Sequence, residues 1–234
     1  MPDNIPFPLY HGTSTLFMDS IFSEGLGGID PIKKNRIIDL AREVKSLADA
    51  NLADCPDYQS RRFSFDQMTK QSTGQFNWQH GESYLSPSIH TAIRYATNKR
   101  FGSEIVTYTL DILTELIRRK IPGVTDNLFQ KYPQAFGWLD SSPSPLLIRV
   151  NDVSRAYLES ETNTSCSQQI AKLESLLKHE PKSFGLVGQQ MNFRLSGPIS
   201  ANQIELFLIQ VTEWQSHGPT FNLYPINPTK TELG

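Results

Sequence analysis

The sequence predicts an α+β fold, and three observations carry that prediction. Helical patterns dominate the first half of the chain, most clearly at residues 35–52, where apolar side chains recur at helical spacing. Strand patterns dominate the end, as at residues 204–213. The regular strand–helix alternation of a doubly wound sheet is missing. Neither a Gly-x-Gly-x-x-Gly nor a Gly-x-x-x-x-Gly-Lys motif is present, which excludes the two common glycine-rich loops that bind nucleotide phosphates.

The first part of the chain predicts a short strand at residues 5–11, followed by a helix that Ser14 caps and Gly25 ends. After the helix at 35–52, the polar residues 53–80 predict a long irregular loop. Helices are then expected directly after Ser88, at 111–119 and at 166–179. The expected strands are 83–85, 104–110, 146–150, 183–187, 192–196, 204–213 and 220–224, and residues 121–145 are rich in turn residues.

Length and charge narrow the function classes. The chain has 234 residues, enough for a sizeable core, with 22 Lys and Arg against 24 Asp and Glu. A net charge of −2 excludes a global basic field for nucleic acid, while a local basic patch stays open. Two cysteines, Cys55 and Cys166, are too few for a disulfide framework and too far apart for a CxxC metal-binding motif. This favours a protein of the reducing cytoplasm, although one long-range disulfide stays possible. No signal peptide or membrane-spanning segment is expected.

Two separate stretches carry residues suited to a nucleotide with a charged aromatic ring. In His11-Gly12 the imidazole can form a hydrogen bond with a ribose hydroxyl. The glycine beside it has no side chain, so a flat amide ring can approach its main chain. Tyr84 follows at a strand edge, and Tyr95 lies in the next helix at a spacing that folds it back toward the same place. Two tyrosines around an aromatic cation form a favourable stack.

Together these motifs resemble the ADP-ribosyltransferase superfamily, in its diphtheria-toxin-like and poly(ADP-ribose)-polymerase-like branch. His11-Gly12 matches the first element of that signature, Tyr84-Leu85-Ser86 the second, and Ala92-Ile93-Arg94-Tyr95-Ala96 its helix. The resemblance implies split, curved antiparallel β-sheets with helices around an NAD-binding cleft. It also implies a single domain over residues 1–234 with an insertion at about 121–180, which matches no part of the signature.

The resemblance implies an enzyme that uses NAD as a substrate and needs no metal. It would break the glycosidic bond of NAD and pass ADP-ribose to a protein or nucleic-acid acceptor. This would be a bacterial or phage toxin, effector or defence enzyme, acting in its own cytoplasm or in that of a target cell, with an antitoxin or inhibitor protein as a possible partner. The residues that would hold NAD are His11, Gly12, Thr13, Tyr84, Ser86 and Tyr95.

The third element of the signature departs from the family. A carboxylate is expected at the start of a late strand, yet Asn192 stands there, and Gln190 is the less favoured match. With His11 and Tyr84, these two amides complete the implied catalytic set. Three explanations compete: a naturally weak or inactive relative, an inactivated variant, or a different register in which Glu205 or Glu82 supplies the charge.

Other classes of function stay open beside the enzyme. The missing carboxylate motivates an NAD- or ADP-ribose-binding module without catalysis. An RNA 2′-phosphotransferase-like enzyme on the same fold would need a denser basic cleft than the net charge suggests. Four arginines are candidates to contact the pyrophosphate or a nucleic-acid phosphate, although a solvated surface position is favoured for each. The Gln75–Gln79 segment is as compatible with a structural turn as with a contact to the adenine or the acceptor, and the histidines show no metal spacing. These arginines are Arg61, Arg62, Arg94 and Arg100.

Overall fold

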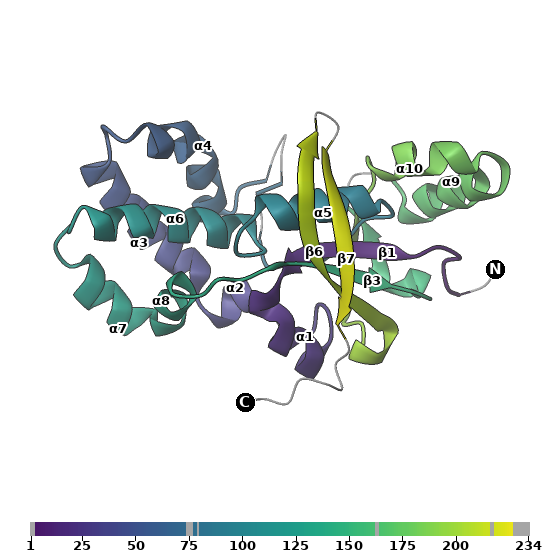
Figure 1. Cartoon of the computed structure of the whole chain (residues 1–234), viewed down its shortest axis with the longest axis horizontal. Coiled ribbons are helices and arrows are strands. Elements are labelled where there is room, and N and C mark those ends of the chain that lie inside the picture. Colours follow the sequence, from purple (N-terminus) through teal and green to yellow (C-terminus); the bar gives the residue numbers. More distant parts are fainter. Residues whose placement is uncertain (1–2, 74–76, 79, 162–163, 216–217, 227–234) are drawn as a thin grey trace. The chain divides into compact units, whose positions relative to one another are not determined.

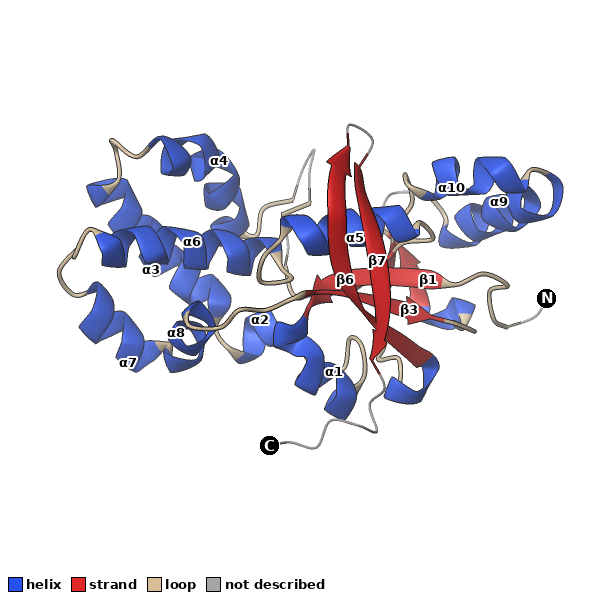
Figure 2. Ribbon diagram, viewed as in Figure 1, coloured by secondary structure: helices blue, strands red, loops and turns tan. Residues whose placement is uncertain are grey.

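A computed structural model of the chain describes residues 3–73, 77–78, 80–161, 164–215 and 218–226. It confirms the α+β class: helices accompany two antiparallel sheets in the described residues (Figures 1 and 2). The chain divides into two compact units. The sheet unit comprises residues 1–29, 82–102 and 143–234, and the helical unit comprises residues 30–81 and 103–142.

The sheet unit contains both sheets. The first has the order β1 (Leu9–Ser14), β3 (Pro145–Val150), β6 (Ile204–Gln215) and β7 (Gly218–Ile226). The second has the order β2 (Tyr84–Leu85), β5 (Phe193–Leu195) and β4 (Leu158–Ser160). Its helices are α1 (Met18–Glu24), α5 (Ile89–Asn98), α9 (Cys166–His179) and α10 (Pro181–Gly188), with short 3-10 turns at Thr15–Phe17, Arg155–Tyr157 and Ala201–Gln203.

Helix α5 packs against β1 and β3 and forms the core on that face of the first sheet (Figure 1). Ala92, Ile93 and Ala96 of α5 are buried against Leu147 of β3 and Ile209 of β6. The helix begins where Ser88 Oγ accepts a hydrogen bond from the Thr91 N–H, as its sequence predicts. This packing fixes α5 directly over the strand that carries His11-Gly12.

The helical unit consists of α2 (Pro31–Lys34), α3 (Ile37–Asn51), α4 (Pro56–Lys70), α6 (Glu104–Arg118), a π-helical turn (Val124–Leu128), α7 (Phe129–Lys131) and α8 (Pro133–Leu139). The predicted helix at 35–52 is confirmed as α3. The predicted loop at 53–80 is wrong, because α4 occupies most of it. Helix α4 buries Tyr58, Phe65 and Met68, which are spaced seven and three residues apart, and most of its other positions are polar.

Two strand predictions are also wrong. Residues 104–110 form the start of α6 and not a strand, because the buried positions 105, 106, 109, 110, 112, 113 and 116 continue one helical period into the segment predicted as helix. Residues 183–187 lie in helix α10. The helix at 166–179 and the strands near 83–85, 146–150, 192–196, 204–213 and 220–224 are confirmed. The expected insertion at about 121–180 is shared by the two units, and the single-domain organisation stays a prediction.

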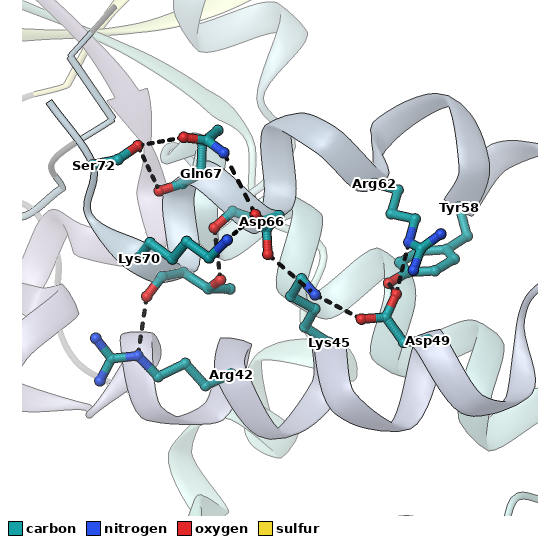
Figure 3. A network of polar contacts seen from close by, with 10 residues as sticks. Arg42, Lys45, Asp49, Tyr58, Arg62, Asp66, Gln67, Lys70 and Ser72 are labelled. Carbon is teal, nitrogen blue, oxygen red and sulfur yellow. Dashed lines mark hydrogen bonds and ion pairs between the residues drawn. The ribbon is translucent and has the colours of Figure 1, made fainter. Parts of the chain in front are cut away.

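A polar network joins α3 to α4 inside the helical unit (Figure 3). Lys45 Nζ of α3 lies 2.6 Å from Asp49 Oδ2 and 3.2 Å from Asp66 Oδ1 of α4. Arg62 Nε and the Tyr58 hydroxyl, both from α4, each donate to Asp49 Oδ1 at 2.8 Å. Bonds to Lys70 and Lys45 lower the pKa of Asp66 against the opposing effect of burial. The ammonium of Lys45 therefore links two carboxylates across the helix pair.

We predict that Lys45→Met destabilises the chain, since both carboxylates then lose a partly buried cation while the alkyl volume is kept. The expected loss in the free energy of unfolding is about 1–3 kcal/mol, measured by chemical denaturation at pH 7. The control is Lys34→Met, an exposed lysine of the same unit, for which a change within about 0.5 kcal/mol is expected. Equal effects of the two substitutions would contradict the role given to Lys45.

Candidate functional site

The candidate site begins where β1 and the segment around β2 separate. Tyr10 and Ser86 exchange two main-chain hydrogen bonds, each 2.8 Å long, so the two segments are antiparallel neighbours there. The next pair in such a ladder would be Gly12 with Tyr84. Instead, His11 Nδ1 lies 2.8 Å from the carbonyl oxygen of Tyr84. The imidazole therefore stands between the two strands and takes the place of a main-chain donor.

This contact determines the tautomer of His11. A carbonyl oxygen accepts hydrogen bonds and cannot donate them, so Nδ1 carries the proton, and in the neutral ring Nε2 is an acceptor. Burial lowers the pKa of His11, and the bond to the Tyr84 carbonyl opposes that shift without reversing it. The ring is therefore neutral at pH 7 and presents Nε2 to a hydroxyl donor.

Gly12 is constrained on one side and open on the other. A Cβ atom at this position would lie 1.9 Å from the carbonyl oxygen of Ala92, so α5 packs too closely for any other residue. Main-chain groups of an antiparallel strand alternate in direction. Those of Gly12 therefore point as those of Tyr10 do, toward the β2 segment, where the ladder has opened. The expected approach of a flat amide to this main chain is compatible with the geometry.

The three-stranded sheet presents one polar face beside this opening. Tyr84, Arg194 and Glu159 lie directly opposite one another across β2, β5 and β4, so their side chains share a face. Two-residue spacing adds three neighbours to it. We call this set the polar face; its members are Glu82, Tyr84, Glu159, Glu161, Asn192 and Arg194.

Hydrogen bonds join the members of the polar face in two groups. The Tyr84 hydroxyl donates to Glu82 Oε2 at 2.7 Å, and Arg194 donates to Glu82 Oε1 at 2.6 Å and also to Glu159. Asn192 Nδ2 donates to Glu161 Oε2 at 3.0 Å. The face carries three carboxylates and one guanidinium, so it is acidic. Burial raises the pKa of the Tyr84 phenol, and the carboxylates of Glu82 and Glu161 raise it further.

Tyr95 lies on α5, two residues after Ile93. Ile93 is buried in the core that includes Ile209 of β6, and the side chain of Arg94 approaches Gly218 of β7. Two steps of about 100° set Tyr95 nearly opposite Ile93 around the helix, and Tyr95 is 41% exposed. The stacking role of Tyr95 stays a prediction.

Other expected site residues have structural partners or lie apart. Ser86 is buried, and its side chain accepts from Ser88 N–H at 3.2 Å and donates to the Met191 carbonyl at 3.4 Å. Thr13 is also buried, with its hydroxyl on the Gly102 carbonyl. Gln190 lies exposed in the turn after α10. These three side chains therefore have less to offer a ligand than His11 and Tyr84.

Glu205 is separated from His11. It lies opposite Arg149, which lies opposite Tyr10, so all three project from the α5 side of the first sheet. His11, one residue after Tyr10, projects from the other side. Glu205 also receives a hydrogen bond of 2.8 Å from Asn151. By contrast, Glu82 contacts the Tyr84 hydroxyl directly, so of the two alternative carboxylates only Glu82 adjoins the candidate site.

The arginines weighed from the sequence have mostly structural contacts. Arg61 pairs with Asp111 at 2.8 Å and Arg62 with Asp49, both within the helical unit. Arg100 stacks on Phe101, with its guanidinium carbon 4.7 Å from the ring centre. Residues 75, 76 and 79 of the Gln75–Gln79 segment, and His217, lie outside the described residues.

Neither a metal-binding cluster nor a membrane-spanning helix is present among the described residues. No group of three or more histidine, cysteine, aspartate or glutamate side chains is arranged to hold a metal ion in this part of the chain. No described helix combines the length and apolar character needed to cross a lipid bilayer.

Sequence reasoning missed Glu159, Glu161 and Arg194. Glu159 lies in β4 and Glu161 directly follows it, and a strand of three residues is too short for a period to show. Arg194 stands inside a correctly predicted strand, but its partners come from strands that the sequence does not pair. The alternation Glu159-Ser-Glu161 is the one signal that would have set both carboxylates on a common face.

We predict that His11 makes stability depend on pH below about 7. Its folded-state pKa is below the unfolded value of 6.5, so the unfolded chain binds more protons and the free energy of unfolding falls as the pH is lowered through that range. In His11→Asn an amide N–H replaces the Nδ1 donor without titrating. Chemical denaturation from pH 5.0 to 7.5 should give a shallower pH slope for this variant, and equal slopes would exclude His11 as the source.

Comparison of the chain with known protein families, with curated proteins and with solved structures gives no match. The residues themselves therefore carry the functional argument.

Proposed function

We propose that the sheet unit binds NAD and transfers its ADP-ribose to a macromolecular acceptor, as an ADP-ribosyltransferase. One observation carries the proposal: the His11 imidazole holds the Tyr84 carbonyl at the point where the β1–β2 ladder opens beside Gly12. Residues from separate parts of the chain thus combine an oriented acceptor nitrogen, a bare main chain and an aromatic ring. The family that the motifs resemble uses these same groups on NAD.

Each group has a role that follows from its chemistry. The carboxamide of nicotinamide would exchange hydrogen bonds with the N–H and C=O of Gly12, which point toward the opening. His11 Nε2 would accept a hydrogen bond from a ribose hydroxyl. Tyr84, with Tyr95 from α5, would stack on the positively charged pyridinium ring, and the acidic polar face favours that charge.

A second candidate is an NAD- or ADP-ribose-binding module without catalysis. The specific observation in its favour is the pair of amides, Asn192 and Gln190, where a carboxylate is expected. An RNA 2′-phosphotransferase-like role has less support, because the carboxylates of the polar face would repel a phosphorylated RNA. The acceptor of ADP-ribose, an inhibitor partner and a toxin, effector or defence role all belong to the first proposal.

The direct test incubates the full chain with NAD labelled in its adenylate part and a cell lysate. Label that becomes attached to a macromolecule supports the transferase, and separate protease and nuclease digestion then tells a protein acceptor from a nucleic acid. Calorimetric NAD binding without nicotinamide release would favour the binding module instead. Absence of NAD binding would overturn both candidates.

We predict that Tyr84→Ala weakens NAD binding roughly tenfold or more, because a stacked aromatic ring is lost. Tyr84→Phe keeps the ring and removes only the hydroxyl bond to Glu82, so its dissociation constant should stay within about threefold of the wild type. Calorimetry measures all three proteins.

The matched control is Tyr224→Ala, which removes a tyrosine that is 50% exposed on β7 and bonded to Gln210. It should bind NAD as the wild type does. Equal binding by Tyr84→Ala and the wild type would contradict the stacking role of Tyr84.

A further inference from the structure

We propose that Glu161, positioned by Asn192, is the carboxylate that stabilises the ribosyl cation when the glycosidic bond of NAD breaks. This inference rests on the proposed function. It assigns to Glu161, the residue directly after β4, the negative charge that the sequence lacks at position 192. The carboxylate would thus reach the site from the neighbouring strand.

The register of the second sheet sets these two residues side by side. Glu159 pairs with Arg194 and Ser160 with Phe193, so the next pair along the two strands is Glu161 with Asn192. Their side chains meet, with Asn192 Nδ2 3.0 Å from Glu161 Oε2. Position 192 is where the family resemblance expects the acid, and the carboxylate of Glu161 lies one hydrogen bond away from it. Glu161 is exposed and so is accessible to a ligand.

The three carboxylates of the polar face differ in how their charge is balanced. Glu82 and Glu159 both accept from the guanidinium of Arg194, which offsets their negative charge. Glu161 accepts from the neutral amide of Asn192, which orients the carboxylate without adding positive charge. A developing cation is stabilised best by a charge that no other cation already offsets. Glu161 meets this requirement better than the other two.

Glu161 also acts on the ring that would stack against nicotinamide. Its charge contributes to the raised pKa of the Tyr84 phenol, although burial and Glu82 contribute more. Glu161 and Tyr84 project from the same face of the second sheet, on the two sides of β5.

The step itself is a heterolytic cleavage. The bond between ribose C1′ and the nicotinamide nitrogen breaks, and its electron pair stays on nitrogen, so the pyridinium leaves as neutral nicotinamide. The positive charge moves to C1′ and the ring oxygen, where the Glu161 carboxylate stabilises it and accepts a hydrogen bond from a ribose hydroxyl. The acceptor then bonds to C1′ and loses a proton to solvent, so that atoms and charge balance.

This arrangement also explains why an amide, and not an acid, stands at position 192. A carboxylate there would lie against Glu161, and two like charges at hydrogen-bond distance do not both stay ionised. Asn192 instead donates a hydrogen bond to Glu161 and adds no like charge beside it. If Asn192 were only a silenced acid, restoring Glu would activate the chain; with Glu161 as the working carboxylate, Asn192→Glu alone gives no gain.

The test measures nicotinamide release at saturating NAD, together with NAD binding by calorimetry, on the full chain. Glu161→Gln should lower the release rate by about 100-fold or more, while the dissociation constant of NAD stays within about threefold. Asn192→Glu should not exceed the wild-type rate. The double variant Glu161→Gln with Asn192→Glu should recover at least about tenfold over Glu161→Gln, because the pair again holds one carboxylate and one amide.

The matched control is Glu213→Gln on β6, since Glu213 also accepts from a neutral amide, that of Gln215 at 3.0 Å. It should release nicotinamide at the wild-type rate, and thermal unfolding checks that each variant is folded. A Glu161→Gln enzyme with full activity, or a large gain from Asn192→Glu alone, would overturn the inference and leave the transferase standing. A wild-type chain that binds NAD without releasing nicotinamide overturns Glu161 as catalytic, and one that does not bind NAD overturns the proposed function itself.

Discussion

The hydrogen bond from His11 Nδ1 to the Tyr84 carbonyl is the contact on which the candidate site depends. It joins the two sheets where their shared ladder would otherwise continue, so it opens a ladder position and holds it open. It needs a proton on Nδ1, which makes Nε2 of the neutral ring an acceptor. Because burial favours that neutral ring, structure and proposed chemistry require the same protonation state.

Gly12 satisfies two requirements at once. The close approach of α5 excludes a Cβ atom on one side, and the opened ladder leaves main-chain groups directed outward on the other. Packing alone therefore explains why glycine stands here, and a substitution at this position would disturb α5 before it revealed anything about a ligand. The proposed NAD binding depends for that reason on His11 and Tyr84, which are joined by a hydrogen bond.

Local signals in the sequence suffice for α3, for the Ser88 cap of α5 and for most strands of the two sheets. They mislead where local and tertiary preferences differ. The β-branched run in residues 104–110 resembles a strand, yet it is helical because α6 is buried on most sides. Helix α4 is too polar for its period to stand out, and its contacts to α3 include the Lys45 network. Of the site, His11, Gly12 and Tyr84 were predictable, whereas Glu161 depends on a pairing between strands 31 residues apart in sequence.

The polar face shows how one cation can distribute charge unequally over three neighbouring acids. Arg194 lies between Glu82 and Glu159 because strand register sets it opposite β2 on one side and β4 on the other. Two residues before Arg194, Asn192 offers an amide and not a second guanidinium, so Glu161 accepts a hydrogen bond from a neutral group. A second arginine at position 192 would offset the charge of Glu161, and an acid there would set two carboxyl groups at hydrogen-bond distance. An amide orients the Glu161 side chain without adding charge of either sign, so the lack of an acid at 192 does not leave this part of the sheet without a carboxyl group.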